Sequence, residues 1–145
     1  MTHQSRNRDL SLDLYRAMDA QDIERVRALV SPRCQSSMGG RQLDFDSWLG
    51  MGRMFMSAFP DGRHVFDLTE GAGDYVLLHG HFTGTHTGEF QGLPATGKVI
   101  KISVTMIDKI IDGKLVEHYG DFDSAGLMQQ LTSSSTGSTR EPSPK

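Results

Sequence analysis

Two residues in the C-terminal half of the sequence, Asp108 and His118, are of the types that move protons in enzymes. They come together if they lie on neighbouring strands. Residues 99–111 are rich in β-branched side chains, Asp112-Gly113 is a strong hairpin signal, and residues 114–122 can form the returning strand. The sequence therefore predicts a hairpin that carries a carboxylate on one strand and an imidazole on the other.

The length of the turn decides which side chains of the returning strand face the core. A two-residue turn directs Asp121 inward, whereas a three-residue turn directs His118 and Phe122 inward. We prefer the three-residue turn, because burying an unpaired carboxylate is unfavourable and Phe122 gains from burial. In that register His118 lies opposite Met106 and diagonal to Asp108, and we expect the imidazole and the carboxylate to meet and to point into a pocket.

Length and composition indicate a single domain and give no sign of binding to nucleic acid or to a membrane surface. The chain of 145 residues is long enough for a single hydrophobic core. A net charge of -3 and a pI near 6.0 give no electrostatic reason to expect nucleic acid or a membrane surface. The single cysteine, Cys34, excludes an internal disulfide and a multi-cysteine metal site. No signal-peptide pattern or membrane-spanning run is present, and we expect a cytoplasmic protein.

The apolar pattern changes from helical spacing to period two along the chain. Helical spacing before Pro60 is followed by strand-like alternation, and Gly80 and Gly84 should allow the longest strand to bend. Helices segregated from a strongly bent antiparallel sheet form a cone-shaped α+β barrel, with a pocket between the concave sheet face and the N-terminal helices. The predicted helices cover 8–20, 23–30, 47–59 and 125–131, and the predicted strands cover 33–38, 64–70, 75–87, 99–111 and 114–122.

Four segments carry a family resemblance: 84–97, Ile107-Asp108, 112–119 and 123–131. Together they resemble the SnoaL-like polyketide cyclase family, which belongs to the nuclear-transport-factor-2-like superfamily of α+β cones. The resemblance covers about residues 9–131, which we expect to be the barrel domain. Before it we expect a flexible N-terminus over 1–8, and after it a disordered tail over 132–145, where Ser, Thr, Pro and Gly dominate.

The resemblance implies an enzyme of aromatic polyketide biosynthesis that uses no cofactor and no metal. It binds a small hydrophobic polycyclic substrate in the cone and acts at an enolisable position. Ring-closing members are similar to aldol cyclases that act on anthracycline precursors, and close relatives are assigned as hydroxylases. Such chemistry needs a group that removes a proton next to a carbonyl.

The sequence departs from the family at the acid–base positions. In the family's cyclases an aspartate shortly after a Glu/Asp-His pair does this work, with an inward histidine on the preceding strand. Those positions are Gly120 and Met106 here, and Asp121 lies one residue beyond the first. The difference favours a relative with altered chemistry, such as a hydroxylase, although a bulge at Gly120 would turn Asp121 inward.

The candidates for acid–base chemistry are His118, Asp108, Asp121 and His86. His86 lies in the most family-like segment, where shaping the loop is an equally good interpretation. His79 and His81 have the spacing of metal ligands, but alternation places them on the opposite face from His86 and no cysteine supports them, so we predict no metal site. The candidates for substrate contact are apolar or aromatic, namely Tyr15, Trp48, Phe55, Phe59, Phe82, Met106 and Phe122.

Two further interpretations concern binding rather than catalysis. The missing acid–base residues leave open a non-catalytic module that binds a small molecule or serves in dimerisation. We also expect a homodimer by family resemblance, built from the outer sheet faces, where Ile107 and Ile111 form an apolar strip among polar neighbours.

Overall fold

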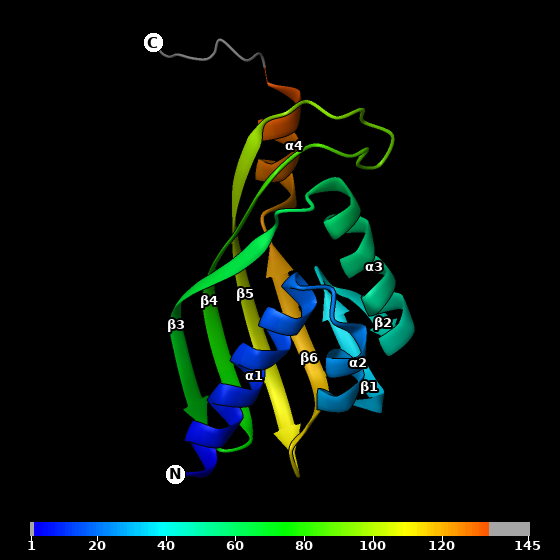
Figure 1. The fold of residues 1–145 in the computed structure, drawn as a ribbon. Helices are drawn as coiled ribbons and strands as arrows, with labels where there is room; N and C mark the ends of the chain where they lie inside the picture. Colours follow the sequence, from blue (N-terminus) through cyan, green and yellow to red (C-terminus); the bar gives the residue numbers. More distant parts are fainter. Residues whose placement is uncertain (1, 134–145) are drawn as a thin grey trace.

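The computed structural model describes residues 2–133 and shows helices packed on one bent sheet (Figure 1). The sheet has six strands in the order β2-β1-β6-β5-β4-β3. The elements along the chain are α1 (His3–Asp19), α2 (Ile23–Leu29), β1 (Val30–Met38), β2 (Arg41–Asp44), α3 (Phe45–Ala58), β3 (Arg63–Ala72), β4 (Tyr75–Thr85), β5 (Val99–Ile111), β6 (Lys114–Phe122) and α4 (Ser124–Thr132). This arrangement confirms the predicted α+β cone.

The sheet is mixed rather than purely antiparallel, which corrects the prediction. β1 runs parallel to β6, while the other neighbouring strands are antiparallel. The chain reaches β1 directly from α2, so β1 can lie beside β6 without a hairpin connection. The Gly39-Gly40 turn then returns the short strand β2, which the sequence pattern did not reveal.

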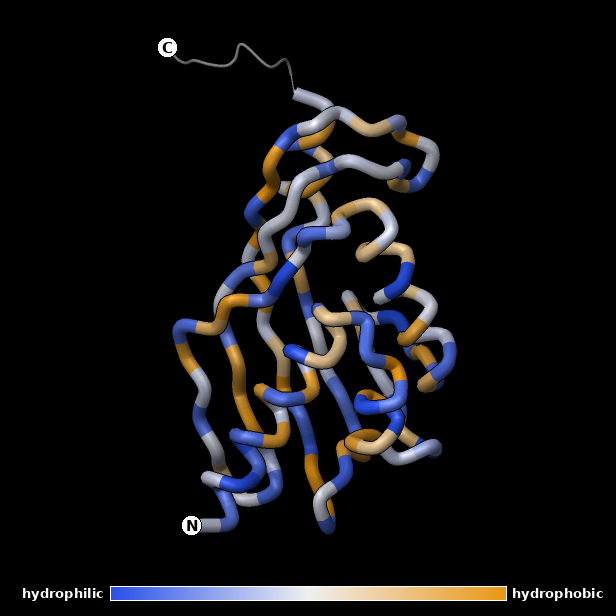
Figure 2. Tube along the Cα trace, viewed as in Figure 1, coloured by the Kyte–Doolittle hydropathy of each residue, from blue (hydrophilic) through white to orange (hydrophobic). Residues whose placement is uncertain are grey.

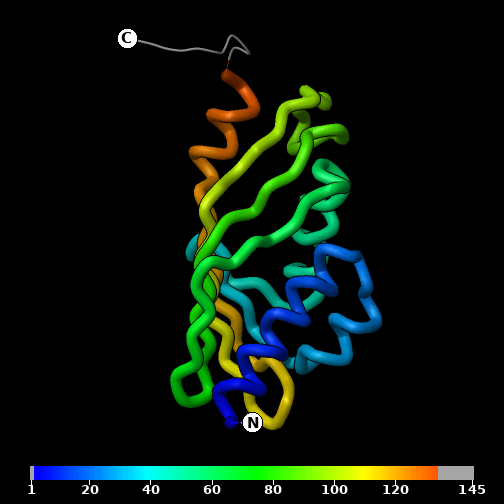
Figure 3. The backbone as a smooth tube through the Cα atoms, turned by 60° about the vertical axis from the view of Figure 1, so that its left-hand side comes forward, coloured from blue at the N-terminus to red at the C-terminus, as the bar shows by residue number. Residues whose placement is uncertain are grey.

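Glycine permits the bend of the sheet at β4. The pairing of β3 with β4 is irregular between Phe66 and Leu68, beside Gly80. A Cβ atom on Gly80 would lie 1.9 Å from the carbonyl oxygen of Val65, so only glycine fits this crossing. Figure 3 shows β4 and β5 leaning towards the helical side in their upper halves. The predicted bend at Gly80 is confirmed.

Burial alternates residue by residue along β4 and β5, as period two predicts. Figure 2 shows the matching alternation of apolar and polar residues along these strands. The inner face packs against α1 and α3, with Leu14 and Phe59 fully buried. Within residues 2–133 no helix is long and apolar enough to cross a membrane.

The first helix begins earlier than predicted. α1 starts at His3 rather than Arg8, because the Thr2 side chain accepts a hydrogen bond from the Ser5 N–H at 3.0 Å and caps the helix. His3 also lies 3.2 Å from Asp74 in the turn after β3. The segment 1–8, which was expected to be a flexible N-terminus, is therefore helical from His3 onward. Most of the predicted tail, 134–145, lies outside the described residues.

The hairpin between β5 and β6 uses a two-residue turn, so the preferred three-residue turn was wrong. Asp112 and Gly113 adopt φ angles of 50° and 75°, typical of the tight hairpin turn. The pairing then shifts by one residue at Val116, which reverses the faces of β6 beyond it. His118 consequently faces inward as predicted, but it lies directly opposite Asp108 rather than diagonal to it.

Candidate active site

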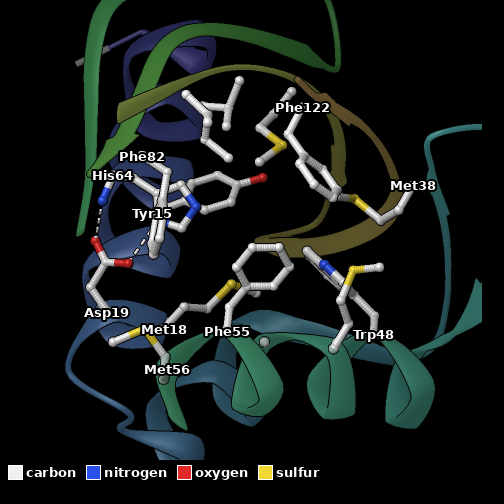
Figure 4. Close-up of a pocket in the computed structure, with 15 residues that line it drawn as sticks. Tyr15, Met18, Asp19, Met38, Trp48, Phe55, Met56, His64, Phe82 and Phe122 are labelled. Carbon is white, nitrogen blue, oxygen red and sulfur yellow. Dashed lines mark hydrogen bonds and ion pairs between the residues drawn. The ribbon is translucent and has the colours of Figure 1, made fainter. Parts of the chain in front are cut away.

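A cavity of about 90 Å³ lies between the concave sheet face and the helices α1 and α3 (Figure 4). Six of the seven predicted substrate contacts line it: Tyr15, Trp48, Phe55, Phe82, Met106 and Phe122. The seventh, Phe59, does not line the cavity. Its ring packs against that of Phe82, with ring centres 6.2 Å apart. The cavity is therefore apolar and rich in aromatic faces, which suits a flat ligand.

Methionines make the cavity adaptable. Five line it, namely Met18, Met38, Met51, Met56 and Met106. Unbranched thioether side chains change rotamer easily and fill irregular space. Sites for drug-sized ligands have volumes of about 300–1,000 Å³, so a polycyclic ligand enters only when some of these side chains move. Phe55 and Phe122, with ring planes at 90°, then provide fixed surfaces for stacking.

The predicted pair of Asp108 and His118 forms in the structure. His118 Nδ1 lies 2.8 Å from Asp108 Oδ1, and both side chains are fully buried. Ser11 donates to Asp108 Oδ2 at 3.0 Å, and the Tyr15 hydroxyl lies 3.1 and 3.2 Å from the two carboxylate oxygens. Because a carboxylate only accepts hydrogen bonds, its three partners all act as donors to it. Both oxygens of the Asp108 carboxylate are thereby hydrogen-bonded to neighbouring side chains.

The buried carboxylate also affects the nearby titratable groups. Burial, followed by the negative charge of Asp108, raises the pKa of Tyr15 well above its usual range. Burial also raises the pKa of the Cys34 thiol to about 12, with smaller contributions from Asp108 and Glu117. Both groups are therefore protonated at neutral pH, and Tyr15 serves as a donor rather than as a base.

His118 is separated from the cavity. Its Nε2 atom lies 3.2 Å from the sulfur of Met38, and its ring stacks on Trp48 with centres 4.1 Å apart. Met38 and Trp48 line the cavity, while His118 and Asp108 do not. The prediction that these two groups point into the pocket was wrong, because a layer of side chains covers them.

The other two acid–base candidates lie away from the cavity. Asp121 is exposed and lies opposite Thr105 on the outer face of the sheet. After the shift at Val116, His118 and Gly120 face inward and Asp121 faces outward. His86 is buried, and its Nδ1 atom accepts a hydrogen bond from the Thr96 N–H at 3.2 Å. The backbone of His86 also bonds to Gly97 and Lys98, so the structure supports the loop-shaping interpretation.

A second pair of histidine and carboxylate, which the sequence analysis missed, lines the cavity. His64 Nδ1 lies 2.7 Å from Asp19 Oδ1, and the His64 backbone N–H donates to Asp19 Oδ2 at 2.8 Å. Figure 4 shows both contacts at one side of the cavity. One feature of the sequence could have indicated this pair: Asp19 lies at the C-terminal end of α1, where the helix dipole disfavours a negative charge. Within residues 2–133 no three metal-binding side chains gather.

The fold and the cavity together define a small cone-shaped α+β protein with an apolar site between the sheet and the helices. The chain belongs to the SnoaL-like polyketide cyclase family, whose profile matches residues 9–131. A comparison with curated proteins finds no match.

Several solved structures have the same fold as this chain. The chain is similar to AclR from Streptomyces galilaeus, a proposed hydroxylase, with 23% identity and a TM-score of 0.82 over 88% of this chain and 82% of that one. It is also similar to IdmH from Streptomyces antibioticus, a proposed polyketide cyclase, with 27% identity and a TM-score of 0.80 over 86% and 97%. A SnoaL-like protein from Jannaschia sp. CCS1 gives 19% identity and a TM-score of 0.83 over 92% and 96%.

We predict that Asp108→Ala lowers the free energy of unfolding by about 3–5 kcal/mol, because it leaves buried donors of Tyr15, Ser11 and His118 without their acceptor. Urea unfolding, followed by Trp48 fluorescence, measures this. The control is Asp121→Ala on the exposed outer face, which should change stability by less than about 0.5 kcal/mol. Equal effects of the two substitutions would contradict a stabilising role for the buried network.

Proposed function

We propose that the protein is an enzyme of aromatic polyketide biosynthesis, cyclase-like or hydroxylase-like. It binds a polycyclic substrate in the cavity and removes a proton from an enolisable carbon. The single observation that carries the proposal is the cavity itself, in which aromatic faces and flexible methionines surround a site with a histidine–carboxylate pair on its wall. This combination fits a flat apolar substrate that carries a reactive carbonyl.

The reaction begins with proton transfer. A base in the cavity takes a proton from the carbon next to a carbonyl, and the electron pair of that bond moves towards the carbonyl oxygen to form an enolate. In a cyclase the enolate carbon then attacks a second carbonyl of the same substrate. The aromatic walls hold the two ends close together and exclude water, which raises the effective concentration of the reacting groups.

The comparisons support this proposal at the level of the family. The family profile covers most of the chain, and IdmH, at 27% identity, is a proposed polyketide cyclase. AclR, at 23% identity, supports the fold alone. The replacement of the cyclase acid–base residues by Gly120 and Met106 favours altered chemistry.

One observation favours a second candidate function, a module that binds a small molecule without converting it. The buried Asp108 and His118 are both 0% exposed and cannot reach a ligand in this conformation. If no other group in the cavity acts on the substrate, the same walls serve binding alone.

Incubation with an anthracycline precursor tests the function. We expect binding, measured by quenching of Trp48 fluorescence, and a new product detected by mass spectrometry. Phe55→Ala should weaken binding by about tenfold, since it removes one aromatic wall, whereas Val99→Ala, at a position 71% exposed, should change nothing. Binding without conversion would establish the binding module instead, and the absence of binding would contradict both functions.

We further propose that the protein forms a homodimer through the outer face of the sheet. Leu77, Ile107 and Tyr119 lie side by side on β4, β5 and β6 and are 37%, 38% and 45% exposed. Contiguous apolar side chains of this kind favour burial against a second copy. Light scattering should give twice the chain mass of 16.0 kDa, and Ile107→Lys should give the single mass. A monomeric wild-type protein would refute the dimer.

A further inference from the structure

We propose that His64, held in place by Asp19, is the base that removes the proton from the substrate in the cavity. The inference rests on the proposed function, because it assumes that the cavity takes an enolisable aromatic ketone. Asp19 is the last residue of α1 and His64 the second residue of β3, so the fold joins two groups that are 45 positions apart. The cavity wall contains both of them.

The contact with Asp19 fixes the protonation pattern of the imidazole. A carboxylate has no proton to donate, so His64 Nδ1, which lies 2.7 Å from Asp19 Oδ1, must carry the hydrogen. When the ring is neutral, Nε2 therefore carries the lone pair, on the side of the ring away from Nδ1. Asp19 also accepts from the His64 backbone N–H at 2.8 Å, so that one carboxylate orients both the ring and its backbone. When Nε2 takes a proton, the charge of Asp19 stabilises the imidazolium.

The Nε2 atom of His64 belongs to a side chain that lines the cavity and also a second hollow, whose wall includes Leu12 and Thr69. It makes no hydrogen bond within residues 2–133, and it is not sealed, since the buried side-chain atoms without a partner there are Ser36 Oγ and His86 Nε2. The side chains of His64 and Asp19 are 17% and 16% exposed. Three aromatic rings hold the imidazole, with centres at 5.3 Å for Tyr15, 5.8 Å for Phe66 and 5.1 Å for Phe82. The base is thus oriented by its neighbours and partly accessible.

The other ionisable side chains of the cavity wall already have hydrogen-bond partners. The ionisable side chains among the described lining residues are Tyr15, Asp19 and His64. The Tyr15 hydroxyl is bonded to Asp108, and Asp19 is bonded to His64. His118 has the same type of carboxylate partner, but the Met38 sulfur and the Trp48 ring cover it. Of the two histidine–carboxylate pairs, only the pair of Asp19 and His64 lies in the wall of the cavity.

The proposed proton transfer needs no reagent besides the substrate, His64 and solvent. The bond between the substrate carbon and its hydrogen breaks, the proton moves to His64 Nε2, and the electron pair of the bond forms the enolate. In heavy water the protonated ring exchanges its proton with solvent and returns deuterium to the same carbon. The net change is the replacement of hydrogen by deuterium, which can be measured with a simple ketone. The substrate class is therefore a flat aromatic ketone with hydrogen next to the carbonyl.

The test uses 2-tetralone, a two-ring aromatic ketone, and proton NMR of the full chain in heavy water. We expect the wild-type protein to accelerate exchange next to the carbonyl and His64→Asn to reduce the catalysed rate at saturating ketone by about 100-fold or more. Asparagine keeps an amide donor for Asp19 but lacks Nε2, so the affinity for 2-tetralone should change by less than about threefold. The matched control is His79→Asn on the same sheet, since His79 is exposed and bonded to Thr105.

Two more variants separate catalysis from structure. Asp19→Asn should lower the rate at saturating ketone more than it lowers affinity, because it no longer fixes the tautomer of His64. In His64→Ala, added imidazole should restore part of the exchange, which a purely structural histidine would not allow. Undiminished exchange in His64→Asn overturns this inference alone. If the wild-type protein binds 2-tetralone without exchange, or does not bind it, the proposed proton-transfer function fails as well.

Discussion

The buried charge of Asp108 is the constraint on which the rest of the structure depends. An ionised carboxylate at 0% exposure is tolerable only with several hydrogen bonds, and here they come from α1 and β6. The helix must therefore lie where Ser11 and Tyr15 reach β5, and the shift at Val116 must turn His118 inward. The network holds α1 against the sheet at the distance that these hydrogen bonds require. The cavity lies in the space that remains between the helices and the sheet.

The molecule contains two pairs of the same chemical type in different surroundings. Asp108 and His118 are fully buried and hydrogen-bonded to Ser11 and Tyr15, as expected of a pair that holds a fold together. Asp19 and His64 meet at the end of a helix and the start of a strand, with one ring nitrogen unpaired beside the cavity. Enclosure, rather than residue type, therefore separates the stabilising pair from the pair proposed for catalysis.

Local patterns in the sequence predicted much of the fold and less of the site. The alternation of apolar and polar residues predicted the strands β4 and β5 and their inner faces. The glycine at position 80 predicted the bend. The contact between Asp108 and His118 was predicted because both lie on one hairpin. The bulge at Val116 has no sequence signature, so the predicted turn was wrong, although the preferred register placed His118 inward and Asp121 outward, as the structure shows. The pair of Asp19 and His64 depends on how α1 crosses β3, which no local pattern encodes.

The most direct test of this division between the two pairs is a crystal structure of the protein with 2-naphthol, an aromatic mimic of the enol of 2-tetralone. We expect the two rings to lie between Trp48, Phe55 and Phe82, with the edge next to the hydroxyl within about 3.5 Å of His64 Nε2. Asp108 and His118 should stay covered by Met38 and Trp48. A naphthol bound against His118, with Met38 and Trp48 displaced, would show that His118 rather than His64 meets the substrate.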